Sequence, residues 1–566
     1  MSRCCCGQAM EWYRAELLRL TECLTSVGTN TKAKTAISKA LRQTNNENAA
    51  RFFAAGMAGM IFLFIVFRWN LIRRARSILL RKVPGFTSAG HALLFVGYLA
   101  TCIAVSFVNI DWSSLVNWAK RLGWVALANI AFITFLSLKN TPLRFLTRYS
   151  YEHLNALHQV AGYCTITWSM LHAVVYIAAW SQTNSLPQLL ETDQIMGIIA
   201  GFAMLTILGT ALLLRKLRYE VFYIVHVVMF MLILIVIGMH RPKISQKSLI
   251  ITIFAACIWI SDRTLRFLKV SFFAFGNTAT ITPLQCGGTR IVLRRSPRSA
   301  SPGSHCFVWI PGIRMAETHP FTVVSKNPLE FVIAACDGFT RDLHAFALKH
   351  PGQSLRASIH GPYGSAPDFT GASKVLFIAG GSGASFSLGA AVDLVRKLGN
   401  SRATRIDIIW AVRVPEILEW YATELEVLES SPLVTIRIHA TRGPSSSPNT
   451  PISRSSMYTL AGLEKASPLT TSPPETPVSP RDSANYDIEK HPESEMQSPP
   501  STIIEAGRPD VARFIVEMVQ NSDANDRIAV VACGPEGLMQ TARKAVAECI
   551  KLDGPSLELH CEQFGF

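Results

Sequence analysis

The chain has 566 residues, 49% of them hydrophobic, and a formal net charge of +16. Its length allows several domains. The basic residues flank apolar segments and accompany no nucleic-acid recognition motif, so we exclude a nucleic-acid partner. We interpret them instead as the loop charges that orient membrane segments. Thirteen cysteines are scattered along the chain, without the spacing of a zinc site or of a small secreted disulfide framework.

Residues 1–51 form a polar N-terminal tail, with a short amphipathic helix expected near Glu11–Leu24. No signal peptide is evident, because no apolar region follows Met1. The cluster Cys4-Cys5-Cys6 would be open to acylation in the cytoplasm, but this would conflict with the topology predicted below.

Seven apolar segments follow the tail and predict a multi-pass helical membrane domain over residues 52–270, surrounded by membrane lipids. The last segment is short and needs flanking residues to span a bilayer. The segments are Phe52–Phe67, Ala92–Val108, Leu122–Leu138, Leu154–Ala179, Ile195–Leu214, Val221–Met239 and Leu249–Ile260.

The short connections between these segments predict their orientation. Connections on one side of the membrane hold fifteen Lys and Arg residues, against five on the other side. Since cytoplasmic loops carry the excess of basic residues, the N-terminal tail is expected outside and the C-terminal part in the cytoplasm. The tail itself holds eight basic residues, which argues weakly for the reverse orientation.

Two of the apolar segments each carry two histidines that are fourteen residues apart, His158 with His172 and His226 with His240. Fourteen residues of helix rise about 21 Å and return to nearly the same face. A single buried histidine is more often a hydrogen-bonded core residue than a ligand. Four equally spaced imidazoles on two membrane helices instead indicate two b-type haems, one above the other.

In the predicted topology His158 and His226 lie near the cytoplasmic edge, and His172 and His240 near the outer edge. Two further histidines, His91 and His153, stand at expected helix ends and belong to no such pair. We interpret both as interfacial side chains rather than haem ligands.

The pattern changes after residue 270 to short runs separated by Gly, Pro and Ser, which predict a small antiparallel β-barrel over residues 271–370. Its expected strands are Thr278–Thr282, Arg290–Arg294, His305–Ile310, Phe321–Val324, Phe331–Ala335 and Ser354–Ser358.

Residues 371–566 alternate strands with helices and predict an α/β domain with a parallel sheet. A stretch rich in Ser, Pro and Thr, residues 443–505, is expected to be a disordered insertion before a helix at Pro509–Val519. The other expected elements are strands Val375–Ala379, Ile406–Val412, Val434–Ala440 and Ile528–Cys533, and helices beyond Ser387, near Glu416–Leu428 and at Glu536–Cys549.

Four short motifs carry candidate chemistry in this C-terminal part. His319-Pro-Phe-Thr-Val-Val-Ser325 offers a flat apolar face and hydroxyls, but taken alone it is as readily a turn entering a strand. Asp337-Gly-Phe-Thr340 opens a helix, either as an ordinary cap or as a phosphate site. Ala379–Gly383 is a glycine-rich loop after a strand, and Cys533-Gly-Pro535 follows another strand as a turn or as the floor of a nicotinamide site.

The order of these motifs resembles the ferric reductase and NADPH oxidase superfamily of transmembrane flavocytochromes b, and the fungal ferric/cupric-chelate reductases most of all. The resemblance covers about Val83 to Phe566 without the Ser/Pro insertion. It depends on the four spaced histidines, His-Pro-Phe-Thr, Gly361-Pro-Tyr-Gly364, the glycine loop, Cys-Gly-Pro and the terminal aromatic residue.

The resemblance implies a cytoplasmic ferredoxin-reductase-like module that binds FAD and NADPH. It assigns FAD to His319, Pro320, Phe321, Thr322, Gly338, Phe339 and Thr340, with Phe566 over the flavin ring. It assigns NADPH to Gly380, Gly381, Ser382, Gly383, Cys533, Gly534 and Pro535. Arg413, after an expected strand, is a candidate for the 2′-phosphate because a guanidinium binds phosphate in a bidentate manner.

The chain departs from the family pattern at three of these positions. Asp337 stands where a second glycine is common, and Ala384 and Phe386 stand where Ile and Pro are commoner. These departures bear on individual contacts and not on the class.

The expected activity is a transmembrane ferric/cupric-chelate reductase that passes electrons from cytoplasmic NADPH through FAD and two haems to metal chelates on the opposite side. FAD is needed because nicotinamide gives up two electrons at once and haem accepts one. The expected location is the plasma membrane, with a vacuolar or other internal membrane as the alternative. A downstream iron or copper permease is an expected partner.

Two other classes of function compete with this prediction. A superoxide-producing NADPH oxidase shares every cofactor motif, but its second histidine pair is usually one residue closer, and no calcium-binding loop is evident near the N-terminus. A non-enzymatic scaffold with a decayed reductase module would not need the intact glycine, His-Pro-Phe-Thr and Cys-Gly-Pro motifs. A haem spectrum of purified membranes would identify such a scaffold.

Overall fold

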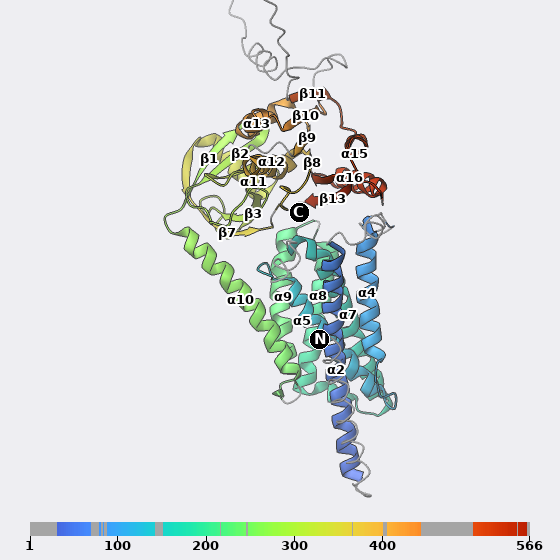
Figure 1. Ribbon diagram of the computed structural model, residues 1–566. Coiled ribbons are helices and arrows are strands. Elements are labelled where there is room, and N and C mark those ends of the chain that lie inside the picture. The colour runs from blue at the N-terminus through green and yellow to red at the C-terminus, as the bar shows by residue number, and fades with distance from the viewer. Residues whose placement is uncertain are drawn as a thin grey trace, which may run out of the picture. The chain divides into compact units, whose positions relative to one another are not determined.

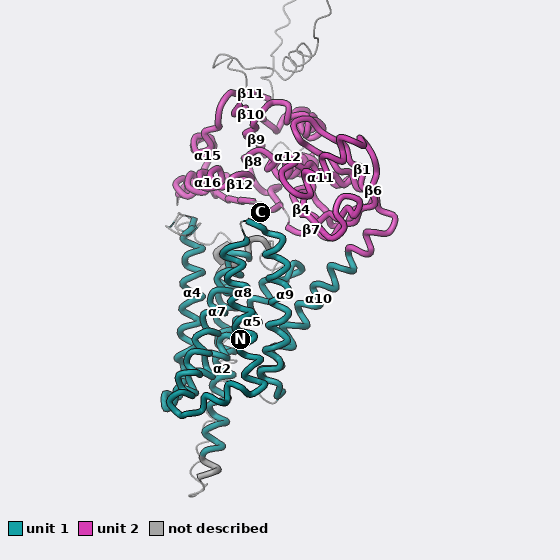
Figure 2. The backbone as a smooth tube through the Cα atoms, turned by 180° about the vertical axis from the view of Figure 1, so that it is seen from behind, with its two compact units in different colours: residues 1–269, 566 teal, residues 270–565 magenta. Residues whose placement is uncertain are grey.

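The computed structural model describes residues 31–562 except 69–78, 81–82, 84–85, 87, 142–150, 216, 245–246, 365, 400–403, 443–501 and 552. The chain divides into two compact units, residues 1–269 with 566 and residues 270–565 (Figure 2). The expected helix near Glu11–Leu24, the cluster at Cys4–Cys6, the insertion up to residue 501 and the terminal Phe566 lie outside the described residues.

The first unit is a bundle of long helices (Figure 1). Six helices in its described part are long and apolar enough to cross a membrane. They are α4 (Ala89–Phe107), α5 (Leu115–Leu136), α7 (Tyr151–Gln182), α8 (Thr192–Leu213), α9 (Tyr219–His240) and α10 (Ser248–Ala274). They confirm the predicted multi-pass helical domain.

The first predicted span, Phe52–Phe67, is the second half of a longer helix, α2 (Thr31–Arg68). At sixteen residues it is shorter than the roughly 20 that a spanning helix needs, and α2 is not among the six spans of the described chain. From Thr31 onward the predicted N-terminal tail, residues 1–51, is helical. The polar half of α2 is helical because it packs on other helices, with Asn46 and Asn48 buried.

Helix α5 is the most enclosed helix of the bundle and packs against α2 and α7, while α8 packs against α9 (Figure 1). Serine caps set where two helices begin. The hydroxyl of Ser88 accepts from the N–H of His91 at 3.2 Å before α4, and that of Ser114 accepts from Val116 at 3.2 Å before α5.

The second unit begins with the predicted antiparallel barrel, made of two sheets with strand orders β5-β2-β1-β6 and β4-β3-β7. Helix α11 (Gly338–Lys349) closes it, and Phe331, Phe339 and Leu343 are among its core residues. The strands are β1 (Thr278–Leu284), β2 (Gly288–Leu293), β3 (His305–Trp309), β4 (His319–Thr322), β5 (Leu329–Ala334), β6 (Gln353–Arg356) and β7 (Ser358–Tyr363).

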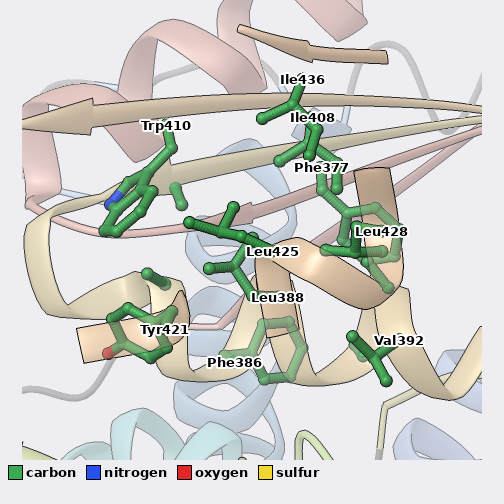
Figure 3. Close-up of a cluster of buried hydrophobic side chains, with 14 of the residues drawn as sticks. Phe377, Phe386, Leu388, Val392, Ile408, Trp410, Tyr421, Leu425, Leu428 and Ile436 are labelled. Carbon is green, nitrogen blue, oxygen red and sulfur yellow. The ribbon is translucent and has the colours of Figure 1, made fainter. Parts of the chain in front are cut away.

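The parallel sheet of the second unit has six strands in the order β11-β10-β9-β8-β12-β13. Its strands are β8 (Lys374–Gly380), β9 (Arg405–Val412), β10 (Val434–Ala440), β11 (Thr502–Ala506), β12 (Arg527–Cys533) and β13 (Ser556–Glu562). Its helices are α12 (Ala384–Leu398), α13 (Ala422–Glu429), α15 (Val511–Gln520) and α16 (Glu536–Cys549). Figure 3 shows the core, where Phe377, Ile408 and Trp410 of the strands lie among side chains such as Phe386 and Leu425 of the helices.

Two details of this domain differ from the sequence prediction. The predicted insertion, 443–505, extends too far, because Thr502–Ala506 forms the edge strand β11 and pairs in parallel with β10. The helix predicted near Glu416–Leu428 starts with the 3₁₀ segment η5 (Pro415–Tyr421), whose Trp420 and Tyr421 are buried. Trp420 donates from Nε1 to the carbonyl of Gln285 at 2.8 Å, so η5 joins the barrel to the sheet domain.

Candidate functional site

The four spaced histidines face one another in two pairs between α7 and α9. The ring centres are 6.2 Å apart for His158 and His226, and 6.3 Å apart for His172 and His240. We call these the inner and outer pairs, after the predicted topology. A metal–imidazole bond is about 2 Å and the ring centre lies about 1.2 Å behind the nitrogen, so two imidazoles on one iron have centres about 6.4 Å apart. Both pairs fit a bis-imidazole haem.

Backbone carbonyls orient both rings of the outer pair. Nδ1 of His172 lies 2.7 Å from the carbonyl oxygen of Ala119, and Nδ1 of His240 lies 2.6 Å from that of Asp193. A carbonyl oxygen only accepts, so each Nδ1 carries the proton and each Nε2 keeps its lone pair for a metal. This is the tautomer that a haem ligand requires.

Two glycines make room for these rings. A Cβ on Gly123 would lie 2.9 Å from the His172 ring, and a Cβ on Gly197 would lie 2.8 Å from Nδ1 of His240. Both distances are below any ordinary contact. The histidine spacing alone did not identify these supporting residues.

The Nδ1 atoms of the inner pair are buried, with the backbone of Ile133 as a polar neighbour of His158. Nδ1 of His158 and Nδ1 of His226 make no hydrogen bond to the described residues, and the Phe222 ring lies 5.4 Å from the His226 ring. A haem between these rings would be bound through Nε2 of each histidine, as at the outer pair. His91 lies in the first turn of α4 against Phe86, and His153 is the third residue of α7, so both stand at helix ends.

The two motifs assigned to FAD meet at one end of the barrel. His319–Thr322 is strand β4, and α11 begins at Gly338, whose φ of +53° suits glycine. The His319 ring stacks on Phe339 with centres 4.5 Å apart. Phe339 itself is 1% exposed and part of the barrel core, so its ring shapes the site from beneath.

Arg314 is a residue of this site that the sequence did not single out. Its guanidinium donates to Glu317 at 2.8 Å and to Asp342 at 3.0 Å, and its Nη atoms lie 3.8 Å from where a Cβ on Gly338 would stand. Partial burial alone would raise the pKa of Glu317, but hydrogen bonds with Arg314 and His319 outweigh it and hold that pKa below its ordinary value. A cation therefore stands beside the start of α11, where phosphate is expected.

The two motifs assigned to NADPH meet where the strand order of the parallel sheet reverses. The loop Gly380–Gly383 follows β8 and Cys533–Pro535 follows β12, and these two strands are neighbours at the centre of the sheet. A Cβ on Gly380 would lie 2.7 Å from the Pro535 side chain. Nucleotides bind at such a switch point, outside the carboxyl ends of the strands.

Trp410 and Arg413 approach the same edge from β9. Nε1 of Trp410 donates to the carbonyl of Gly381 at 3.0 Å, which fixes the glycine loop, and no sequence motif predicted this contact. Arg413 is exposed just beyond β9, and its carbonyl accepts from the N–H of Arg442 at 2.8 Å. Two guanidinium-bearing residues thus lie side by side at this end of the sheet.

A multi-pass helical domain joined to a barrel and a parallel nucleotide-binding sheet defines a membrane protein with a flavin and nicotinamide module. Family models agree segment by segment. They are "ferric reductase like transmembrane component" over residues 122–237, "FAD-binding domain" over 277–367 and "ferric reductase NAD binding domain" over 372–547. Family models for the three parts of a ferric reductase thus match this chain in the order that the motifs predicted.

Similar proteins include fungal ferric reductases. A probable cell surface ferric reductase of Aspergillus oryzae is 28% identical over 420 residues, which cover 65% of this chain and 55% of the relative. Two Saccharomyces cerevisiae proteins, ferric reductase transmembrane component 3 and ferric/cupric reductase transmembrane component 2, are 26% and 25% identical, and each match covers 76% of this chain and 59% of the relative. The chain thus spans between 55% and 59% of these relatives' lengths.

Proposed function

We propose that this chain is a transmembrane ferric/cupric-chelate reductase that carries electrons from cytoplasmic NADPH to metal chelates on the far side of the membrane. The observation that carries the proposal is the geometry of the inner and outer histidine pairs, whose ring centres are 6.2 Å and 6.3 Å apart. The names of the relatives, ferric and ferric/cupric reductases, support the choice of acceptor. Superoxide production by an NADPH oxidase is not favoured by these relatives.

When bound, FAD and two b-type haems would turn a two-electron hydride donor into a one-electron path across the membrane. The chain's own residues position that path. His158 with His226, and His172 with His240, would each hold one haem iron, which would carry single electrons. The fourteen-residue spacing separates the two pairs by about 21 Å along the helices.

The second unit would hold the nucleotides. His319 and its neighbours in β4, with the start of α11 and Arg314, would receive FAD. The loop Gly380–Gly383, fixed by Trp410, would receive the NADPH pyrophosphate, with Cys533 at the floor of the nicotinamide site. NADPH preference over NADH would depend on Arg413.

The proposal places the protein in the plasma membrane with its C-terminal module in the cytoplasm, upstream of an iron or copper permease.

The test uses sealed vesicles that receive NADPH on the side of the reductase module. They enclose a ferric chelate, a cupric chelate or oxygen alone. Reduction of an enclosed metal chelate is expected. Superoxide formation without metal reduction would favour the oxidase, and no trans-membrane reduction of any acceptor would refute the proposal.

A further inference from the structure

The end of the bundle at the outer histidine pair carries more positive charge than its neighbours neutralise. Lys120 directly follows Ala119, whose carbonyl holds His172, and Arg241 directly follows His240. Both cations therefore stand beside the outer pair. Lys120 is exposed and lies within electrostatic reach of Arg241 and Lys39.

Helix α2 brings Lys39 to this place. Asn46 accepts from Nε of Arg121 at 2.8 Å, and the carbonyl of Asn45 accepts from Nη2 of Arg121 at 3.3 Å, which fixes α2 against α5. Lys39 stands seven residues before Asn46, which is two turns along nearly the same face. Its exposed side chain thus lies on the face that meets α5.

Two other cations at this end are already paired. Arg42 binds Asp111 at 3.0 Å, and Lys247 binds Glu47 at 2.5 Å. In contrast, Lys39, Lys120 and Arg241 form no salt bridge with any described residue. Among the described residues, buried Arg121 donates hydrogen bonds only to the side-chain amide oxygen of Asn46 and to backbone carbonyl oxygens.

The acidic groups at this end are fewer than the unpaired cations. Asp193 contributes a carboxylate beside His240, and Glu191 stands two residues before it. Together they offset two of the positive charges that Lys39, Lys120, Arg121 and Arg241 carry. Like charges held together are unfavourable unless an anion joins them, and a one-signed patch attracts anionic partners.

We propose that Lys39, Lys120 and Arg241 form the docking site for an anionic metal chelate beside the outer histidine pair. This inference rests on the proposed function and names the charge class of its substrate. Each docked ferric ion gains one electron and becomes ferrous, and one NADPH is oxidised to NADP⁺ with release of a proton for every two ferric ions reduced.

The test compares two acceptors of opposite charge in sealed vesicles, anionic ferric–EDTA and cationic hexaammineruthenium(III). The test variant is Lys39→Gln with Lys120→Gln. The control is Arg215→Gln with Arg218→Gln, an equal loss of two charges at exposed residues beyond the opposite end of α8. We expect the test variant to raise the KM for ferric–EDTA about tenfold and to lower the KM for hexaammineruthenium, since each exposed charge changes affinity by about threefold.

Direct binding provides a readout other than activity. Gallium(III)–EDTA, which the path cannot reduce, should bind the purified full chain in equilibrium dialysis, more weakly at high salt and about tenfold more weakly to the test variant. Equal KM changes for both acceptors, or unchanged gallium–EDTA binding, would overturn the docking site. Loss of haem absorbance in the test variant with unchanged gallium–EDTA binding would also overturn it, because the lysines would then serve the haem carboxylates.

Failure of the proposed function would look different. Wild-type vesicles would reduce neither enclosed acceptor, while NADPH would still reduce a soluble dye at the reductase module. Gallium–EDTA dialysis would report on the docking site even in that case.

Discussion

Gly383 lies directly against the backbone of Cys533, so that a Cβ on Gly383 would stand 2.4 Å from the Cys533 carbonyl oxygen. The two residues are 150 positions apart in the sequence; Gly383 follows β8 and Cys533 ends β12. Their contact brings the two predicted nucleotide motifs together. It also explains a glycine whose own φ, −58°, makes no special demand.

This contact predicts the effect of Gly383→Ala. The added methyl meets backbone rather than a movable side chain, so we expect the sheet domain to lose at least about 2 kcal/mol of stability. Gly537→Ala is the control, because no atom lies within 4 Å of its Cβ position and it stands in helix α16. The measurement is Tm with and without NADP⁺. Equal Tm values and equal NADP⁺ shifts in both variants would contradict the expected clash.

Glycine motifs of this kind were predictable because each follows a recognisable strand within a few residues. The contacts that complete the sites were not. Trp410 reaches Gly381 from a neighbouring strand, and Arg314 reaches the start of α11 from a loop before β4. Such contacts depend on the order of strands in the sheet and barrel, which local periodicity does not encode.

The outer histidine pair predicts the effect of His172→Ala. We expect the haem content to fall from two per chain to one and trans-membrane reduction to stop, because one axial ligand of the outer pair is lost. NADPH reduction of FAD should persist, since both nucleotide sites lie in the second unit. Haem absorbance and dye reduction measure the two effects. His91→Ala, a histidine at a helix end outside both pairs, is the control. Undiminished trans-membrane reduction in His172→Ala would rule out the haem path.

Burial predicts that the thiol of Cys533, at the candidate nicotinamide site, reacts slowly with alkylating reagents. Burial raises the pKa of Cys533, and the carboxylate of Glu562 raises it further. Because the thiolate is the nucleophile, iodoacetamide at pH 8 should modify exposed Cys336 and leave Cys533 unmodified until the protein unfolds. Peptide mass spectrometry measures both sites. Labelling of Cys533 as fast as Cys336 in the native protein would show that the site is open.

The raised pKa of Cys533 also makes the stability of the protein depend on pH. The native Cys533 thiol stays protonated at a pH where the unfolded thiol ionises, so unfolding then releases a proton. This contribution to stability is therefore complete below the ordinary pKa of 9.0 and is lost as pH rises above it.

We predict that the Ser/Pro segment can be replaced, provided that the replacement is long enough to connect the end of β10 to the start of β11. Strand β10 ends at Ala440, and Thr502 of β11 pairs with Ile436, so the connection must return along the whole strand. Excising Ser445–Pro500 would leave five residues, and a parallel crossover needs about a dozen.

We therefore expect reductase activity close to wild type when a Gly/Ser linker of about twelve residues replaces Ser445–Pro500, and a destabilised sheet domain after a direct join. NADPH-dependent dye reduction and Tm distinguish these outcomes. Loss of activity with the linker in place would assign the segment a structural role.

The limits of the sequence prediction in this region have one physical cause. Strand β11 is only five residues long and follows a polar stretch, and its partner β10 supplies the hydrogen bonds that define it. Helix α2 is a similar case. Its polar half, which includes buried Asn46, is stabilised by α5 and not by an apolar stripe of its own.

Arg413 provides the last prediction, on cofactor choice. Its side chain is exposed at the carboxyl end of β9, and it forms no salt bridge with Glu416 or any other described residue. A charged hydrogen bond to the ribose 2′-phosphate is worth on the order of 1.5–3 kcal/mol, and each 1.4 kcal/mol is about tenfold in affinity. Arg413→Ala should therefore weaken NADPH use by roughly tenfold to a hundredfold and leave NADH use nearly unaltered.

The matched control for Arg413 is Arg405→Ala, because Arg405 is exposed at the opposite end of the same strand and binds Asp407 at 3.3 Å. Steady-state kinetics with both cofactors should show no change of preference in that variant. Arg442→Ala tests the neighbouring residue, whose backbone N–H donates to the Arg413 carbonyl and whose side chain is exposed. If Arg413→Ala affects both cofactors equally, or neither, Arg413 lies outside the 2′-phosphate site, and a selective effect of Arg442→Ala would move that role one strand along the sheet edge.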